Sequence, residues 1–238
     1  MAQRILTLNA GSSSLKFATF VASTGSAPAL DLRGQLAGIG QGETKLTVTD
    51  EHGNRARWGS TAHIATHEDA VRLLIERLEI EQHPSDWLGA GHRIVHGGAR
   101  FSRPVKIAAE TVAELAALIP LAPLHQPHNV APIAALRKLL PDLPQVACFD
   151  TAFHATQPEH AMRFALPEQY WRDGLRRYGF HGLSYEAILH TLPEVAGGVP
   201  QRLIDDVLHH KVGRVVAAGA VALAAVVEQV DRPGLRTE

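Results

Sequence analysis

The segment ILTLNAGSSSLKF, residues 5–17, places an Asn, a Gly, three Ser and a Lys between two short apolar runs. Gly11 permits an unusual backbone angle, and consecutive N–H groups beside serine hydroxyls can form a concavity that binds an anion. Lys16 would add a positive charge, and Asn9 could hold a metal-bound water. The turn is expected to be longer than the two residues that an ordinary hairpin needs. A polar hairpin with solvated serines explains the same residues equally well.

Arg93 lies in the apolar strand context of GHRIVHGG, residues 91–98. A buried guanidinium needs an anionic partner, and its fork geometry suits a carboxylate or a phosphate. Considered alone, Arg93 fits a structural ion pair with an Asp or Glu slightly better than a ligand site. His92 and His96 would share a face only on a helix, and the Gly-Gly that follows argues against one. A pair of metal-binding histidines is therefore not expected here.

Three further stretches carry polar residues where loops are expected. PLHQPH holds His125 and His128 beside prolines, where functional residues often lie, although a surface histidine is the commoner case. Asp150 ends the apolar run QVACF, and ligands of open α/β sheets bind at such strand ends. An Asp at that place more often caps or turns the chain. His181 is flanked by glycines and aromatic residues in YGFHG, which lets the backbone approach a ligand closely.

These residues need a scaffold, and the apolar patterns predict one that opens with strands and continues with helices. Strands are expected at residues 4–8, 15–20, 31–37, 45–49, 89–95 and 145–149. Helices are expected at residues 68–80, 108–118, 131–140 and 184–192, the first of them with a capping box at 66–69. The order predicts an α/β fold whose sheet begins antiparallel. The stretches PLAPLHQPHN, DTAFHATQPEH and RRYGFHG are expected to be loops.

The composition bounds the classes of function. With 238 residues, 45% of them hydrophobic, the chain can form one large domain or two of moderate size. A net charge of -1 gives no electrostatic reason to expect nucleic acid or a membrane surface as a partner. The single cysteine, Cys148, excludes an internal disulfide and fits a reducing cytosol. We expect a cytoplasmic protein without a signal peptide or a membrane span.

The motifs NAGSSSLKF, GHRIVHGG, PLHQP, FDTAFH and RRYGFHG occur in this order, and together they resemble the acetate kinase (acetokinase) family over residues 1–198. The resemblance implies the sugar kinase/Hsp70/actin superfold, with two ribonuclease-H-like α/β domains around a cleft. It also implies reversible transfer of the γ-phosphoryl group of ATP to acetate, with Mg2+, which yields acetyl phosphate and ADP. A homodimer is one assembly that the resemblance allows.

The resemblance also implies a role for particular residues. Asn9 corresponds to the magnesium site, and Arg93 matches the arginine that binds the substrate carboxylate. His181 matches a histidine that stabilises the transition state, and Asp150 matches the essential acidic residue. The catalytic set is therefore Asp150, His181 and Arg93. Val95, Leu124 and Phe180 match the apolar pocket for the methyl group of the substrate, whose carboxylate Arg93 binds. The residues expected near the phosphates of ATP are Ser12, Ser14, Lys16 and His125.

A carboxylate substrate bears on the role of Asp150. Acetate is already ionised near neutral pH, so its attack on a phosphoryl group needs no deprotonation. Asp150 is therefore better understood as an orienter of Arg93 or of metal-bound water than as an obligatory base.

Two departures from the family pattern matter. The family continues FHG with T-S-H, whereas this chain has Leu183-Ser184-Tyr185, which removes a hydroxyl and an imidazole from the expected phosphate region. After Gly198 the Gly-rich phosphate loop, a further arginine and the adenosine pocket are missing, and residues 199–238 resemble nothing in the family. That tail predicts helices at residues 201–211 and 215–230. The expected domains are an N-terminal domain at 1–150, an incomplete nucleotide domain at 151–198 and a helical tail at 199–238.

Acetate kinase is accordingly the predicted function, carried by the acetate and metal half of the site. One alternative is an impaired fragment that only binds carboxylate or phosphate, and whose exposed apolar face favours oligomers. A propionate kinase is another, since only the size of the pocket would separate the two. A histidine-rich metal hydrolase is disfavoured, because the 14 histidines lack a ligand spacing such as H-E-x-x-H.

Overall fold

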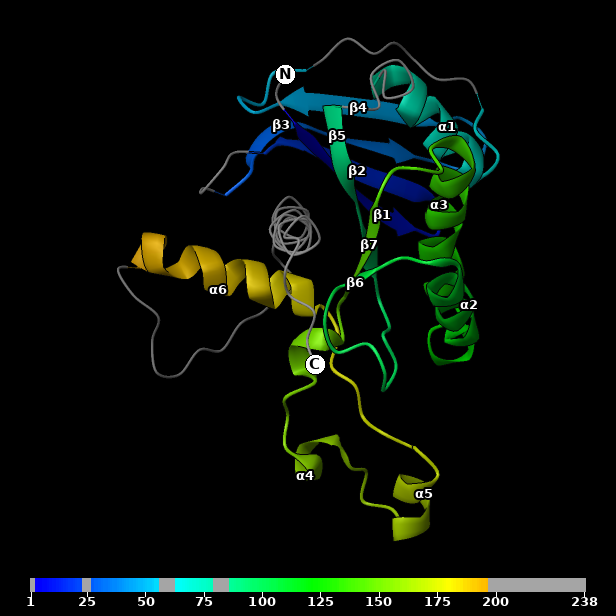
Figure 1. Ribbon diagram of the computed structural model, residues 1–238, viewed down its shortest axis with the longest axis vertical. Helices are drawn as coiled ribbons and strands as arrows, with labels where there is room; N and C mark the ends of the chain where they lie inside the picture. Colours follow the sequence, from blue (N-terminus) through cyan, green and yellow to red (C-terminus); the bar gives the residue numbers. More distant parts are fainter. Residues whose placement is uncertain (1–2, 23–26, 56–62, 79–85, 197–238) are drawn as a thin grey trace.

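The computed structural model describes residues 3–22, 27–55, 63–78 and 86–196, so the helices predicted in the tail lie outside the described residues. At its centre is a seven-stranded sheet with the strand order β4-β3-β2-β1-β5-β7-β6 (Figure 1). The strands are β1 (Arg4–Gly11), β2 (Ser14–Val21), β3 (Ala29–Ala37), β4 (Lys45–Asp50), β5 (Trp87–Ile94), β6 (Val105–Lys106) and β7 (Gln145–Phe149). The helices are α1 (His67–Leu78), α2 (Ala109–Ala117), α3 (Gln126–Leu139), α4 (Glu159–Met162), α5 (Glu168–Arg172) and α6 (Gly182–Ala196), with 3-10 turns η2 (Ile119–Leu121) and η3 (Ala152–His154).

The sheet begins as an antiparallel meander and continues with parallel strands. β1 pairs with β2, β2 with β3 and β3 with β4, all antiparallel. β5 pairs parallel with β1, and β7 pairs parallel with β5, whereas the edge strand β6 pairs antiparallel with β7. The connection from β1 to β5 contains the other strands of the meander and α1, and that from β5 to β7 contains β6, α2 and α3. The predicted α/β fold with an antiparallel start is thus confirmed. As a consequence, the carboxyl ends of β1, β5 and β7 lie at one edge of the sheet.

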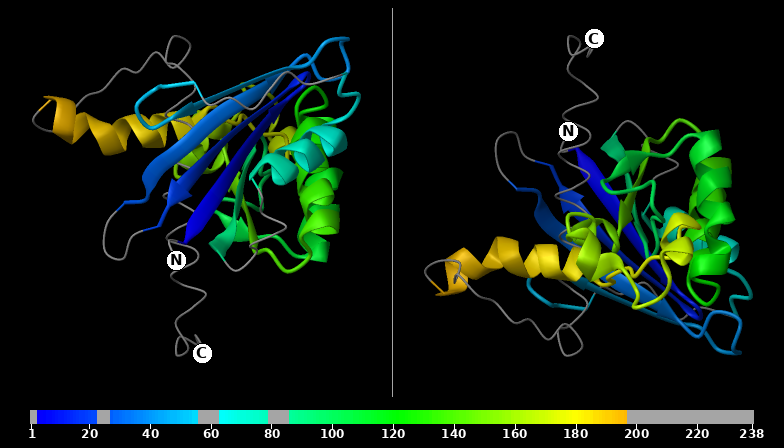
Figure 2. Two further views of the ribbon diagram at one scale, coloured as in Figure 1. Left: turned by 90° about the horizontal axis from the view of Figure 1, so that it is seen from above. Right: turned by 90° about the horizontal axis from the view of Figure 1, so that it is seen from below.

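The long helices lie on opposite faces of the sheet (Figure 2). α1, α2 and α3 cover one face, and α6 lies on the other. α1 begins after Thr66, whose Oγ1 accepts a hydrogen bond from the backbone N–H of Asp69 at 3.1 Å and donates one to Asp69 Oδ2 at 2.6 Å. Thr66 therefore caps the helix, which is one half of the predicted capping box. Leu74 of α1 and Leu136 of α3 pack into one buried core with Leu8 of β1. This core joins one face of the sheet to α1 and α3. The opposite face of the sheet is free to pack against other segments.

Alternation along the strands assigns each residue to one of the two faces. Leu8 and Ala10 of β1 belong to the core beneath α1 and α3, whereas Ile5 belongs to a second core on the opposite face. That second core comprises Ile5, Ala18, Phe20, Val146, Cys148 and Leu183. Asn9 and its cross-strand partner Lys16 alternate with the residues of the first core, so both lie on the face of α6.

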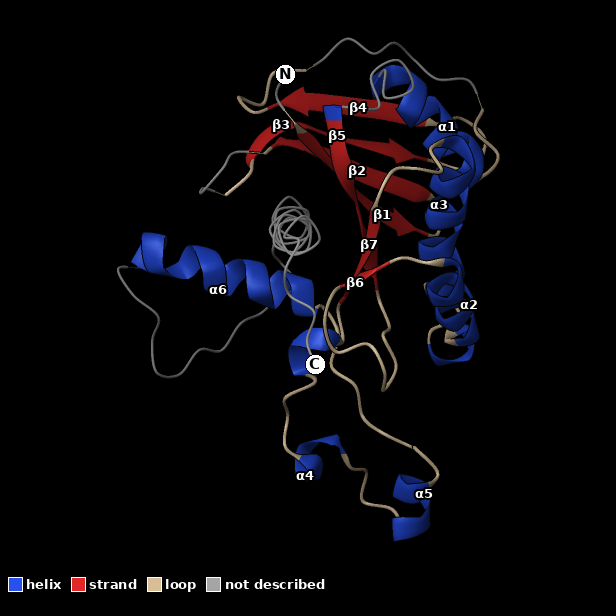
Figure 3. Ribbon diagram, viewed as in Figure 1, coloured by secondary structure: helices blue, strands red, loops and turns tan. Residues whose placement is uncertain are grey.

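The chain between η3 and α6 extends away from the sheet as loops with two short helices, α4 and α5 (Figure 3). Within the ranges that the structure describes, no helix combines the length and apolarity needed to cross a membrane.

Three local predictions are wrong. The turn of the first hairpin is not long: the strand ladder runs on to the pair Gly11 and Ser14, so only two serines remain between the strands. α3 begins at Gln126, so the end of PLAPLHQPHN is helical rather than loop. Pro127 is tolerated there because an N–H in the first turn of a helix has no intrahelical partner. DTAFHATQPEH contains η3 and the start of α4 rather than loop alone.

Candidate active site

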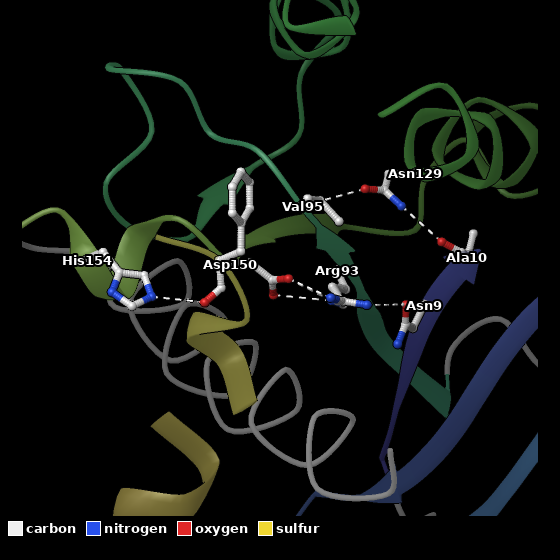
Figure 4. A network of polar contacts seen from close by, with 8 residues as sticks. Asn9, Ala10, Arg93, Val95, Asn129, Asp150 and His154 are labelled. Atoms are coloured by element: carbon white, nitrogen blue, oxygen red, sulfur yellow. Dashed lines mark hydrogen bonds and ion pairs between the residues drawn. The ribbon is translucent and has the colours of Figure 1, made fainter. Parts of the chain in front are cut away.

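Three polar side chains meet at the carboxyl ends of three neighbouring parallel strands (Figure 4). Asn9 lies near the end of β1, Arg93 lies near the end of β5, and Asp150 directly follows β7. Each alternates with a residue that is buried beneath the helices, so all three belong to the face of α6. This edge is where open α/β sheets bind their ligands.

Arg93 forms an ion pair with Asp150. Its Nη2 lies 2.6 Å from Oδ2, and its Nε lies 3.2 Å from Oδ1 and 3.1 Å from Oδ2. The carboxylate side chain is 1% exposed, whereas that of Arg93 is 23% exposed. A buried carboxylate without this partner would be strongly unfavourable. The ion pair expected for Arg93 is therefore present, and it lies at the ligand-binding edge.

The guanidinium of Arg93 is not fully used by this pair. Three of the five N–H donors of a guanidinium are engaged, since Nη1 also donates to Asn9 Oδ1 at 3.2 Å. One N–H on each Nη nitrogen has no acceptor among the described residues. Two such donors suit the two oxygens of a carboxylate or two phosphate oxygens. Arg93 can thus hold Asp150 and an anionic ligand at the same time.

Lys16 adds a second cation on the same face. It pairs with Asn9 across the hairpin. Burial lowers the pKa of Lys16, and the positive charge of Arg93 lowers it further. Two cations that are partly desolvated and repel each other are stabilised by an anion nearby. The end of β1 is therefore electrostatically suited to a negatively charged ligand.

Hydrogen bonds to backbone carbonyls hold the serine turn, residues 11–14, in place beside Lys16. The carbonyl of Ser13 accepts hydrogen bonds from the N–H groups of Gly38 and Ile39, both at 3.0 Å. His67, the first residue of α1, donates from Nε2 to the Gly11 carbonyl at 2.7 Å. Burial lowers the pKa of His67, which favours its neutral form. The turn is thus a braced element rather than a loosely solvated loop.

The serine hydroxyls of this turn are available to a ligand. Ser12 is exposed, and Ser14 is partly exposed. Neither hydroxyl forms a hydrogen bond with the part of the chain that the structure describes. Since Ser14 lies two residues from Lys16 on β2, a hydroxyl and an ammonium group stand at the same end of the strand.

His181, which lies next to the backbone contact with Asp150, has a strained backbone. It has φ 59°, in the left-handed region, and no other non-glycine residue among those described has a positive φ. The next residue, Gly182, donates its N–H to the Asp150 carbonyl at 3.0 Å. A Cβ at Gly182 would lie 2.0 Å from that carbonyl oxygen, so only glycine fits. Strain of this kind persists where the surrounding structure imposes it, and it concentrates at functional sites.

The predicted pocket residues are brought together only in part. Val95 follows β5 and is buried, whereas Phe180 is 40% exposed beside the ring of His96, with a centroid distance of 5.8 Å. His154 Nε2 donates to the Phe180 carbonyl at 3.0 Å, which ties this segment to η3 (Figure 4). Leu124 is 76% exposed, so the structure does not pack it against Val95.

His125 also lies outside this cluster. It occupies the N-cap position of α3 and is exposed, and its side chain makes no capping hydrogen bond. The expected contact of His125 with a phosphate stays a prediction, as does that of His181.

The departures at Leu183 and Tyr185 have structural rather than ligand-facing roles. Leu183 is 4% exposed and packs in the core on the α6 face of the sheet. The Tyr185 ring stacks on Phe153 at a centroid distance of 5.4 Å and meets the ring of His154 edge-on. The expectation that both positions face the phosphate region is therefore wrong for Leu183, because its side chain points into the sheet.

Sequence inspection missed two residues that brace the site. Asn129 of α3 is 3% exposed and hydrogen-bonds to the backbone of Val95 and of Ala10. His67 holds the serine turn. Asn129 could have been noticed as a polar residue directly before the apolar run VAPIAAL of the same helix. Nothing in the sequence marks His67 apart from its place beside the capping box.

Comparisons with known proteins show which family the chain belongs to. The profile of the acetokinase family matches residues 4–218. The match continues past residue 198, so the expectation that residues 199–238 resemble nothing in the family is wrong for residues 199–218. Visible motifs end at residue 198, whereas a profile also scores weaker positions.

An acetate kinase of Rhodopseudomonas palustris is 47% identical over 198 residues, which cover 83% of this chain and 50% of that protein. The crystal structure of an acetate kinase from Porphyromonas gingivalis matches with a TM-score of 0.70 and 36% identity, over 82% of this chain and 49% of that one. A propionate kinase from Francisella tularensis gives a TM-score of 0.71 at 33% identity, over the same shares, 82% and 49%. The fold is the one that actin, Hsp70 and the sugar kinases share. The chain spans about half the length of the relatives that it matches.

Proposed function

The chain belongs to the acetokinase family, and we propose that its described residues form the carboxylate-binding and phosphate-binding side of an acetate kinase site. The complete site transfers the γ-phosphoryl group of ATP to acetate and forms acetyl phosphate and ADP, reversibly. One observation carries the proposal: Arg93 is neutralised by Asp150 and still has two N–H donors for an anion. The resemblance of relatives named acetate kinase supports it.

In this proposal, Arg93 binds and orients acetate. A carboxylate oxygen of acetate attacks the γ-phosphorus, and the bond from that phosphorus to the β–γ bridging oxygen breaks. Arg93 offsets the repulsion between the acetate anion and the phosphates of ATP. No proton has to move, because acetate is ionised near neutral pH. Asp150 therefore acts as a positioning residue: both of its oxygens accept hydrogen bonds from Arg93, which fixes the guanidinium plane.

Phosphoryl transfer passes through a loose transition state with charge on the equatorial oxygens, so positioning and charge stabilisation dominate catalysis. We assign this work to the serine turn and to His181. Ser12, Ser14 and Lys16 contact phosphate oxygens of ATP, and His125 does so from the start of α3. His181 donates a hydrogen bond to the transferring group, and its left-handed backbone is the strain that this placement requires.

The oxygen donors of the site fit magnesium, the ion that the family implies. No group of three or more His, Cys, Asp or Glu residues suited to a metal occurs within the described ranges. Magnesium rarely needs such a cage, because it keeps several waters and binds substrate phosphates. Asn9 and Asp150 would hold it through such waters, because amide and carboxylate oxygens are the kind of ligand that suits Mg2+. When bound, the ion neutralises charge on the phosphates.

The pocket for the methyl group is assigned to Val95, Phe180 and Leu124. Because Phe180 and Leu124 are exposed, they close over the substrate only on binding. A propionate kinase is the second candidate, since a protein of that name is among the similar structures and Val95 alone is too small to exclude an extra methylene. The ratio of kcat/KM for acetate and propionate decides between them.

The proposed domain division follows the sheet. Residues 1–150 form the N-terminal domain, because all seven described strands lie within it. Residues 151–198 begin the nucleotide domain, and a homodimer is the assembly that we propose. A chain that binds carboxylate without catalysing is the alternative for this polypeptide.

A hydroxamate assay for acetyl phosphate tests the function. Purified protein is supplied with ATP, Mg2+ and acetate beside the Asp150→Asn variant. Product that disappears in the variant supports the proposal. A folded protein that forms no product but binds acetate is the non-catalytic alternative, and one that binds no acetate contradicts both.

A further inference from the structure

Asn129 lies between the ends of two strands that carry the site. Its Oδ1 accepts a hydrogen bond from the Val95 backbone N–H at 2.9 Å, and its Nδ2 donates to the Ala10 backbone carbonyl at 3.0 Å (Figure 4). The residue is 3% exposed, so neither contact is shared with bulk water. The side chain comes from α3, which covers the face of the sheet opposite to Arg93 and Asn9.

The register of β1 and β5 shows which backbone hydrogen bond the Asn129 carboxamide replaces. β1 and β5 pair in parallel up to Leu8 and His92. Continued in the same register, the ladder would place Ala10 opposite Ile94. The Ala10 carbonyl and the Val95 N–H would then be the acceptor and the donor that a parallel ladder joins directly. Asn129 binds both, and its carboxamide has the same donor and acceptor groups as a peptide.

The neighbouring strand pair behaves differently. β5 and β7 stay joined to their ends, since the Asp150 N–H donates to the Ile94 carbonyl at 2.9 Å after the last ladder pair. Of these two strand pairs, only β1 and β5 separate before their ends. Asn9 and Arg93 stand on the two sides of that separation, and the 3.2 Å contact between Arg93 Nη1 and Asn9 Oδ1 spans it. Val95, the buried residue of the proposed pocket, lies at its end.

We propose that Asn129 is a positioning residue that acts as a spacer: it holds β1 and β5 apart and so sets the width of the carboxylate site. The part of this inference that concerns ligands rests on the proposed function. Without the Asn129 carboxamide, the Val95 N–H and the Ala10 carbonyl form a hydrogen bond with each other. The crevice, by which we mean the separation between the ends of β1 and β5, then narrows. A longer carboxylic acid then loses more affinity than a shorter one.

The first test needs no ligand. The Nε–H of Arg93 is held by Asp150 and gives a side-chain signal in a 1H–15N NMR spectrum of the full chain. Asn129→Ala is expected to shift this signal, because Asn9 moves relative to Arg93. Gln145→Leu is the matched control. Gln145 is also a buried amide, and it bonds to His92 at 2.8 Å, but it lies at the amino end of β7, away from the crevice. An Arg93 signal that is unchanged in Asn129→Ala, or shifted equally in the control, overturns the spacer role.

The second test titrates acetate and propionate into the same proteins and follows the same signal. Asn129→Ala is expected to weaken acetate binding about tenfold, which corresponds to about 1.4 kcal/mol, and propionate binding by more. A merely structural role would weaken both acids by one common factor, and that result contradicts the inference.

Two further outcomes are separable. If the unaltered chain binds neither acid, the proposed function fails, and the ligand-free shift alone decides the spacer role. If Asn129→Ala does not fold, Asn129→Asp replaces it: this variant keeps the acceptor for Val95 and loses the donor to Ala10. It is then expected to shift the Arg93 signal and to leave the Val95 amide protected from hydrogen exchange.

Discussion

The backbone N–H of Gly182 donates a hydrogen bond to the backbone carbonyl of Asp150 at 3.0 Å. Through this contact, the segment that ends in His181 is joined to the end of β7, where the Asp150 side chain pairs with Arg93. Two motifs that are separated in the sequence by the arm of α4 and α5 are thereby held side by side.

Gly182→Ala is expected to lower the free energy of unfolding by at least about 2 kcal/mol, because the added Cβ would lie 2.0 Å from the Asp150 carbonyl oxygen and 2.5 Å from Phe153 Cβ. Gly174→Ala is the control. Its φ of +89° makes alanine strained, but nothing lies within 4 Å of the added carbon, so it should cost only about 1 kcal/mol. Urea unfolding measures both variants. Equal losses would mean that the fit of Gly182 against Asp150 contributes nothing.

His181→Gly is expected to unfold about 1 kcal/mol less readily than His181→Ala, because alanine keeps the Cβ that is unfavourable at φ 59° and glycine does not. Both variants remove the imidazole, so both should lose acetyl phosphate formation to the same extent. Thermal or urea unfolding gives the difference in stability. A His181→Ala variant as stable as His181→Gly would show that the residue is not strained in solution.

Arg93→Ala is expected to lower the free energy of unfolding by about 3 kcal/mol, because it leaves a carboxylate that is 1% exposed without a partner. Adding Asp150→Asn removes the buried charge, so the double variant should be more stable than the sum of the two single losses implies. A double-mutant cycle measured by urea unfolding gives the coupling. Strictly additive losses would contradict the pairing of these two side chains.

Arg93→Ala should also weaken acetate binding far more than nucleotide binding, because the unused N–H donors of Arg93 face a carboxylate in the proposed site. Separate titrations with acetate and with ATP, in the presence of Mg2+, compare the two affinities. Losses of the same size for both ligands would remove Arg93 from the carboxylate site.

His92 predicts a dependence of stability on acid. Burial lowers the pKa of His92 from 6.5 to about 4, whereas Gln145 opposes that shift through a hydrogen bond. The folded protein therefore binds this proton less readily than the unfolded chain. The free energy of unfolding is expected to be highest above about pH 6.5 and to decrease, by about 3 kcal/mol for this group, as pH falls to about 4.

His92→Gln removes that titration and serves as the comparison. Carboxylates that titrate in the same range contribute equally to both proteins, so the difference between their curves isolates His92. Urea unfolding between about pH 7 and pH 4.5 measures it. Parallel curves for the two proteins would show that His92 is not buried in its neutral form.

Much of the scaffold is predictable from local patterns. The strands β1, β2, β5 and β7 and the helices α1 and α2 fall where apolar periodicity and the capping box indicate them. The errors lie where a residue has two local preferences. Pro127 suits a loop and equally the first turn of α3, and the serines after Gly11 suit a turn and equally a strand pair. Long-range pairing decided both cases, because the ladder and the packing of α3 involve residues far away in the sequence.

The chemistry of the site follows from the residue types at known positions: Asn9, Arg93 and Asp150 were identified from motifs that include them. The sequence did not identify which carboxylate pairs with Arg93, since any Asp or Glu could have served. The sequence also did not predict that Leu183 is buried in the core between α6 and the sheet. Parity along the strands places Arg93, Asn9 and Asp150 on one face, and the packing of α6 on that face places Leu183 against the sheet.

The sequence by itself determined the family, the α/β order of the elements and the residues that can bind anions, because these depend on residue identity and on spacing along the chain. Only the tertiary structure decided that Asp150 neutralises Arg93, that His181 is held in a left-handed conformation, and that Asn129 separates β1 from β5. The first and the last are contacts between segments that are distant in the sequence, and the conformation of His181 is accompanied by one, the hydrogen bond from Gly182 to Asp150. Such contacts depend on how the strands register and on which face the helices cover, and no local pattern encodes either.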